Sequence, residues 1–313
     1  MRRFLNIVVA GLLIALSLAA CQGGAGNGTA QQPTMNPLVV ASDLAVGQNR
    51  FVFAILDEKD QPVDNASVHV RFLRVVGNSA QPAGEADAAF RSVTIKTPHP
   101  HEGGQLHEHQ EARGVYVVDN ASFNSAGIWQ AEISATLADR RGPFTLSASF
   151  QVKPRSDTPS LGAPAPASRN KTAKDVQNLK EISTMAPPNP ALYRLSVAQA
   201  LAQRRPFLAV FASPAFCQSR ICGPVTEETA TLLPKYGDRM ELIHIEPYDL
   251  NAAQNQGRLL LTPIAREWNL PSEPWVFIVD GQGRIAAKFE GIVTAQELEG
   301  AIQKVLGSTG GAY

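Results

Sequence analysis

The feature that most constrains this chain is a pair of cysteines between an apolar segment and a helix signal. The run over 206–211, Pro-Phe-Leu-Ala-Val-Phe, predicts a buried strand. A proline and two glutamates after the second cysteine predict a helix over 225–236. Cys217 and Cys222 therefore fall in a strand-to-helix loop, where the N–H groups and dipole of a helix start stabilise a thiolate. This pattern predicts a site for sulfur chemistry.

The first 21 residues predict a signal peptide. Two arginines precede an uninterrupted run of largely apolar residues over 4–20. The run ends in Leu-Ala-Ala-Cys, which resembles the bacterial lipobox, and the resemblance implies that Cys21 becomes the lipidated first residue of a lipoprotein. An uncleaved anchor helix is the alternative, since about 17 apolar residues is the short limit for a membrane span. Both interpretations predict an extracytoplasmic protein of the bacterial envelope, tethered to the cell membrane.

The balance of charges argues against a nucleic-acid-binding protein, and the cysteine content predicts one disulfide. The 28 basic and 28 acidic residues balance, which argues against a nucleic-acid partner because such proteins carry clustered excess Lys and Arg. Of three cysteines, Cys21 is assigned to the lipid, so Cys217 and Cys222 remain as a pair. In an oxidising compartment two thiols five positions apart are expected to form a disulfide. A length of 313 residues allows about two domains.

The first half of the chain shows short strands separated by turns. About seven such strands without a helix predict an antiparallel β-sandwich over 38–153. Trp129 is expected in its core. A tether over 22–37, rich in Gly, Asn, Thr and Gln, precedes this domain, and a linker over 154–190, rich in Pro, Ala and Ser, follows it.

Three local features carry a resemblance in this half. They are the strand end at Leu56-Asp57 before a turn at Pro62, the segment 114–116 (Gly-Val-Tyr), and the segment 126–129 (Ala-Gly-Ile-Trp) before the final strand. With them the domain resembles the YtkA/FixH-like immunoglobulin-type domains of bacterial envelope proteins. The resemblance implies an immunoglobulin-like fold and an accessory or metal-associated role.

Four of the six histidines fall within eleven residues, as His99, His101, His107 and His109. Imidazole, with the glutamates beside it, is a ligand type suited to copper, zinc or nickel. On a strand, His-x-His places both rings on one face. The alternative is a solvated hairpin loop that binds metal only adventitiously, because two glycines between the pairs indicate a loop.

The last third of the chain alternates between strand and helix patterns. Capping boxes at Ser196 and Thr294 predict helix starts, and Asp280-Gly281 predicts a hairpin turn. The order of strand, cysteine loop, helix, strand, short helix, hairpin and final helix predicts an α/β sandwich on a mixed sheet over 191–308.

This order resembles the thioredoxin fold. The cysteine loop, the closing hairpin with its helix, and Pro274 directly before a strand carry the resemblance, since Pro274 matches the family's cis-proline. It implies thiol–disulfide oxidoreductase activity, with Cys217, Cys222 and Pro274 as the catalytic residues, no required cofactor, and thiols or disulfides of envelope proteins as partners.

The motif departs from the family, whose cysteines are separated by two residues rather than four. Either Cys217 is the counterpart of the attacking cysteine, or Cys222 is, with Gly-Pro-Val completing the motif. Glu273, beside Pro274, would raise the pKa of a nearby thiol, and Arg220 would lower it. Two hypotheses follow: a membrane-anchored redox lipoprotein, or a non-enzymatic metal-handling or scaffold lipoprotein whose disulfide only staples a loop.

Overall fold

The computed structural model describes residues 35–64, 66–100 and 106–308, with the side chains of 97–100, 106–109 and 308 excepted. Contacts divide the chain into residues 1–33 and one compact unit, Thr34–Tyr313. The predicted signal peptide, Cys21 and nearly all of the tether lie outside the described residues. Among the described residues, no helix has the length and apolarity needed to cross a membrane.

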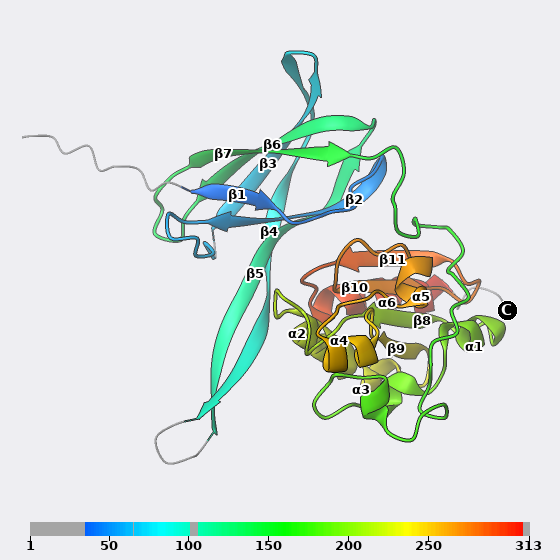
Figure 1. The fold of residues 1–313 in the computed structure, drawn as a ribbon. Coiled ribbons are helices and arrows are strands. Elements are labelled where there is room, and N and C mark those ends of the chain that lie inside the picture. Colours follow the sequence, from blue (N-terminus) through cyan, green and yellow to red (C-terminus); the bar gives the residue numbers. More distant parts are fainter. Residues whose placement is uncertain (1–34, 65, 101–105, 309–313) are drawn as a thin grey trace, which may run out of the picture. The chain divides into compact units, whose positions relative to one another are not determined.

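Seven antiparallel strands form the first sheet, in the order β1-β2-β5-β4-β3-β6-β7. They are β1 (Asn36–Val39), β2 (Gly47–Leu56), β3 (Ser67–Val76), β4 (Ser79–Pro100), β5 (Leu106–Phe123), β6 (Gly127–Thr136) and β7 (Phe144–Val152). Figure 1 shows β4 and β5 as a long two-stranded hairpin. Strand β4 pairs with β3 through residues 79–88 and with β5 through residues 89–100.

Aromatic side chains fill the core of this sheet. The Phe51 ring of β2 lies 4.9 Å from the Phe150 ring of β7 and 5.1 Å from the Phe72 ring of β3, measured between centroids. Strands far apart in the sheet order thus meet through their side chains, and the sheet is nearly closed. Trp129 is fully buried and packs edge-on against Phe123, which confirms it as a core residue.

The prediction of a two-sheet immunoglobulin-like sandwich is therefore wrong. The seven strands are joined in one nearly closed order rather than in two separate sheets, because the 22-residue β4 pairs with β3 through residues 79–88 and with β5 through residues 89–100. One continuous antiparallel sheet is the result.

The second sheet has four strands in the order β11-β10-β8-β9, with β8 and β9 parallel and the other pairs antiparallel. These are β8 (Phe207–Phe211), β9 (Glu241–Ile245), β10 (Trp275–Val279) and β11 (Ile285–Glu290). The helices are α1 (Val197–Ala202), α2 (Cys222–Thr231), α3 (Leu233–Tyr236), α4 (Leu250–Gln256), α5 (Pro263–Glu267) and α6 (Ala295–Ser308), with 3-10 turns η1 (Leu179–Glu181) and η2 (Pro190–Tyr193). Every residue of β8, β9 and β10 is buried.

The predicted α/β thioredoxin-like sandwich is also contradicted, because the described structure is mostly β with few helices. Four of the six helices have seven residues or fewer. Local sequence shortens them: the helix predicted over 225–236 begins at Cys222 and divides at Leu232, two residues before Pro234, whose missing N–H interrupts helical hydrogen bonding. Helix α4 ends at Gly257, which adopts the left-handed conformation.

Part of the predicted linker is packed against the last third of the chain. The indole of Trp268 donates to the Ser168 hydroxyl at 3.0 Å, and that hydroxyl donates to Glu267 at 2.6 Å. Asn170 accepts the backbone N–H of Val197 at the start of α1. The predicted domain boundaries themselves stay a prediction.

Gly114 is a position where a side chain does not fit. A Cβ atom there would lie 2.6 Å from Cε2 of Phe90, whose ring covers the glycine from the neighbouring strand. We expect Gly114→Ala to lower the free energy of unfolding by about 1–3 kcal/mol, as overpacking does. Urea denaturation measures the change. Gly84→Ala is the matched control in β4, since a Cβ there meets nothing within 4 Å; equal losses in both variants would contradict the prediction.

Candidate functional site

The predicted disulfide between Cys217 and Cys222 is confirmed, with 6.0 Å between the two Cα atoms. The two cysteines differ in access: Cys217 is 8% exposed, and Cys222 is fully buried. Cys222 is the first residue of α2, and Ile221 at the N-cap makes no side-chain hydrogen bond to the helix. The N–H groups and dipole of the helix start therefore act on Cys222 without competition from a capping side chain.

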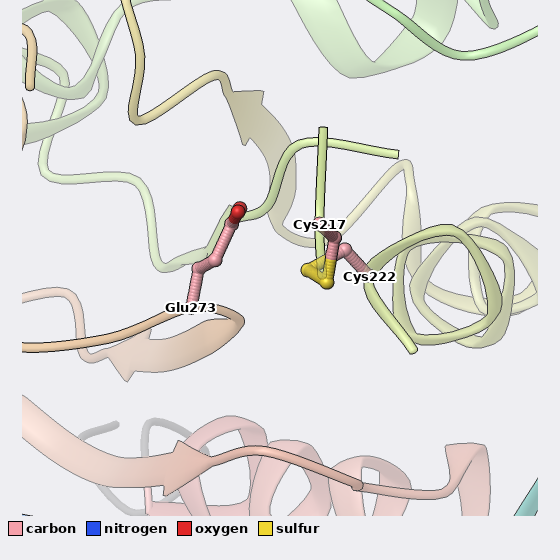
Figure 2. Close-up of side chains that lie close together, drawn as sticks. All are labelled: Cys217, Cys222 and Glu273. Carbon is pink, nitrogen blue, oxygen red and sulfur yellow. A yellow bond between two sulfur atoms is a disulfide. The ribbon is translucent and has the colours of Figure 1, made fainter. Parts of the chain in front are cut away.

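Glu273 is the third member of the site (Figure 2). One carboxylate oxygen of Glu273 and the sulfur atoms of Cys217 and Cys222 all lie within 4.8 Å of one another. Burial raises the pKa of Glu273, a hydrogen bond from the Ser213 N–H lowers it and repulsion from Glu246 raises it, with a net pKa of about 7. The Ser213 N–H donates to Oε2 at 2.7 Å and fixes the carboxylate. Glu273 is joined to Pro274 by a cis peptide bond immediately before β10.

A buried hydrogen-bonded chain holds the end of β8, where the cysteine loop begins. His244 on β9 lies 2.8 Å from the Ala212 carbonyl through Nε2 and 2.6 Å from the Tyr193 hydroxyl through Nδ1. Burial lowers the pKa of His244, so the ring is neutral. The carbonyl only accepts, so Nε2 carries the proton and Nδ1 accepts from Tyr193. The Tyr193 hydroxyl oxygen also lies 2.6 Å from the Ser183 hydroxyl oxygen.

A second set of hydrogen bonds ties the cysteine loop to the predicted linker. The Thr184 N–H and hydroxyl donate to Oε1 of Glu246 at 2.6 and 2.7 Å. The same hydroxyl accepts the N–H of Ala215 at 3.1 Å. Thr184 thus links Glu246 to the loop two residues before Cys217.

A cavity of about 330 Å³ lies beside the disulfide. Its lining includes Lys96 of β4, the accessible Cys217, and Arg220 and Glu227 on either side of the start of α2. Charged groups of both signs therefore surround Cys217, the more exposed of the two bonded cysteines.

The predicted histidine cluster is only partly described. The backbone register pairs His99 with His107 and Thr97 with His109 near the end of the β4–β5 hairpin. His101 lies outside the described residues. The metal-ligand geometry of these histidines remains a prediction. Among the described side chains, the group able to hold a metal is instead Cys217, Cys222 and Glu273.

Sequence reasoning named the two cysteines and Pro274 but missed the residues that support them. His244 stands in a fully buried strand, and a buried imidazole requires hydrogen-bond partners. That requirement was the available signal. No local sequence pattern indicated a role for Tyr193 or Thr184. Their hydrogen-bond partners, His244 and Glu246, follow them in the sequence by 51 and 62 residues.

Removing the Tyr193 hydroxyl tests the chain behind the loop. We expect Tyr193→Phe to cost about 1–3 kcal/mol of stability, because Nδ1 of the buried His244 loses its hydrogen-bond donor. Chemical denaturation measures it. Tyr236→Phe is the control, since that hydroxyl contacts the part-exposed Glu299. A loss no larger than the control's would show that the hydrogen bond adds nothing to stability.

The comparisons with known proteins give no family. No family model matches the chain, and no curated protein matches it. Among solved structures, one described as "ZirS C-terminal Domain" aligns at 10% identity with a TM-score of 0.19, over 47% of this chain and 87% of that chain. A TM-score this low carries no statement about fold or function. The described residues show a mostly β protein with a disulfide at a helix start.

Proposed function

We propose that this chain is an extracytoplasmic lipoprotein, anchored through Cys21, that exchanges disulfides with envelope proteins through Cys217 and Cys222. The observation that carries the proposal is the unequal access of the two sulfurs. Cys217 borders a cavity and is 8% exposed, while Cys222 is fully buried at the first position of α2. One reachable sulfur and one protected sulfur is the arrangement that exchange through a mixed disulfide requires.

The proposed reaction has two steps. A partner thiolate attacks Sγ of Cys217, the Cys217–Cys222 bond breaks, and Cys222 leaves as a thiolate stabilised at the start of α2. A second partner thiol, as thiolate, then attacks the partner sulfur of the mixed disulfide and releases Cys217. The partner dithiol is oxidised by two electrons, and the disulfide of this chain becomes two thiols. The reverse sequence reduces a partner disulfide.

Trapping the mixed disulfide tests this order of attack. We expect Cys222→Ser, which retains the Cys217 thiol, to accumulate a mixed disulfide with a peptide that carries a disulfide. The Cys217 thiolate attacks that disulfide and displaces one peptide thiolate, and no Cys222 is present to release the adduct. Cys217→Ser should accumulate far less. Mass spectrometry after acid quenching reads the adduct. Equal trapping by both variants would contradict the assigned order. A reduction potential below about −300 mV, without exchange, would instead assign the bond a structural role.

The histidine hairpin supports a second candidate function, non-enzymatic metal handling. The backbone pairing of His99 with His107 brings imidazole-bearing residues from two strands to opposing positions. We expect tight one-site copper or zinc binding that is lost when His99, His101, His107 and His109 are all replaced by alanine. Calorimetry measures the affinity and the number of sites. Weak binding at several sites would show that the hairpin binds metal only adventitiously and would contradict this function.

A further inference from the structure

The disulfide and Glu273 form a set of metal ligands that the redox reaction does not itself need. Two sulfur atoms and one carboxylate oxygen lie within 4.8 Å of one another. In a tetrahedral zinc site, neighbouring ligand atoms are about 3.6–3.8 Å apart, given Zn–S and Zn–O bonds of about 2.3 and 2.1 Å. Reduction frees the two bonded sulfurs to separate to this spacing by side-chain rotation, and the carboxylate oxygen, at most 4.8 Å from either sulfur, needs to approach by about an ångström.

The surroundings suit a bound cation. Two thiolates and a carboxylate at this spacing would repel one another strongly in a buried site unless a divalent ion compensated them. The Ser213 N–H donates to Oε2 of Glu273, and the neighbouring Tyr248 hydroxyl lowers the pKa of this carboxyl. Such outer contacts orient the first ligands of a metal site. Within the described residues the buried Ser213 hydroxyl and Oε2 of Glu246 have no hydrogen-bond partner.

We propose that the reduced protein binds one tetrahedral divalent metal ion of the zinc class through Cys217, Cys222 and Glu273. Three protein ligands leave a fourth position open, which the cavity beside Cys217 makes accessible to water or a small anion. The carboxylate ligand favours a divalent ion such as zinc over Cu(I), because Cu(I) prefers a site made of soft sulfur ligands alone. The site is distinct from the histidine hairpin and does not depend on exchange with a protein partner.

Binding is coupled to the redox state of the pair. A dithiol reductant converts the disulfide into two cysteine thiols and is itself oxidised to a disulfide, a transfer of two electrons and two protons. The metal ion then replaces the two thiol protons, which are released to solvent. Oxidation expels the ion, because neither sulfur of a disulfide is a thiolate. The proposed site is thus open only in the reduced protein.

Cobalt titration of the full chain tests the proposal, in a background where the four hairpin histidines are alanine. After reduction with a phosphine we expect one equivalent of Co²⁺ to bind with thiolate charge-transfer and tetrahedral ligand-field absorption, and Zn²⁺ to displace it. The oxidised protein should show neither absorption. Cys217→Ser should abolish the spectrum.

The carboxylate ligand is tested separately. Glu273→Gln should weaken binding by more than about 100-fold, above the 10–100-fold typical of losing an outer contact, and Tyr248→Phe should fall within that lower range. Glu227→Gln is the matched control, an exposed acid on the same cavity, and should bind as the parent does. Unchanged binding by Glu273→Gln, or a non-tetrahedral spectrum, would overturn the proposal while leaving disulfide exchange untouched.

Discussion

Asp43→Asn is expected to lower the free energy of unfolding by about 3–5 kcal/mol at neutral pH, the range for breaking a buried ion pair. The carboxylate is fully buried and lies 3.2 and 3.3 Å from the Lys288 and Lys153 ammonium groups. It also accepts the N–H groups of Asp157 and Thr158 at 2.8 and 3.1 Å. All of these neighbours are donors, so the amide NH₂ of asparagine would face other donors and leave Lys288 uncompensated.

The pH dependence of this loss identifies its cause. Burial raises the pKa of Asp43, but hydrogen bonds from Ser156 and Asp157 and attraction by Lys288 outweigh it, so this pKa lies well below its ordinary value of 3.8. A depressed carboxyl pKa stabilises the folded state above the unfolded pKa, and the contribution is lost as pH falls through the folded pKa. The stability difference between parent and variant should therefore be constant from about pH 7 to pH 5 and narrow below about pH 4.

Urea denaturation across this pH range measures the difference. Asp139→Asn is the control, because the Asp139–Arg141 pair is exposed on both sides. Hydrogen bonds from Arg141 also lower the pKa of Asp139, so this variant shows how small the stability change and its pH dependence are for a solvent-screened pair. A loss for Asp43→Asn that persists unchanged at the acid end would assign the effect to packing rather than to charge.

The sequence predicted those features whose signals are local. Two cysteines five positions apart in an apolar strand-to-helix context form the disulfide. The box Ser196 to Gln199 caps α1 as predicted, with both reciprocal hydrogen bonds present. In each case all of the interacting groups lie within a few residues of one another in the sequence, so the local sequence alone determines the contact.

The features that were missed depend on contacts distant in sequence. Strand β4 contains Pro82, Gly84 and Pro98, which in a local sequence pattern indicate turns or strand ends. Pairing with β3 and β5 nevertheless keeps the backbone extended through all three residues as one strand. The site shows the same limit. Ser213 and Glu273 are 60 residues apart, and only the pairing of β8 with β10 makes the N–H of one a donor to the other.

Arg50→Met is expected to cost about 3–5 kcal/mol of stability, for a reason that a second substitution can isolate. The Arg50 guanidinium donates to Oε1 of Glu297 at 2.9 Å and to the carbonyls of Ile292 and Glu290 at 2.7 and 3.1 Å. The side chains of Arg50 and Glu297 are only 8% and 7% exposed. Methionine fills much of the space but leaves a buried carboxylate without this partner, with Arg91 3.7 Å away as the remaining cation.

Most of the stability lost in Arg50→Met should come from the buried Glu297 carboxylate, which no longer has its Arg50 partner. Adding Glu297→Gln to Arg50→Met removes the buried charge, so we expect the double variant to be more stable than Arg50→Met alone. Glutamine gives up part of the cap of α6, where Oε2 of Glu297 accepts the Thr294 N–H at 3.0 Å, at about 0.3–1 kcal/mol. The loss of this cap costs less free energy than the unpaired Glu297 carboxylate does. The double variant should therefore be destabilised less than the single variant Arg50→Met. Denaturant midpoints of the four proteins in this cycle decide the matter: additive losses would mean that Arg50 acts through its two carbonyl contacts and not through Glu297.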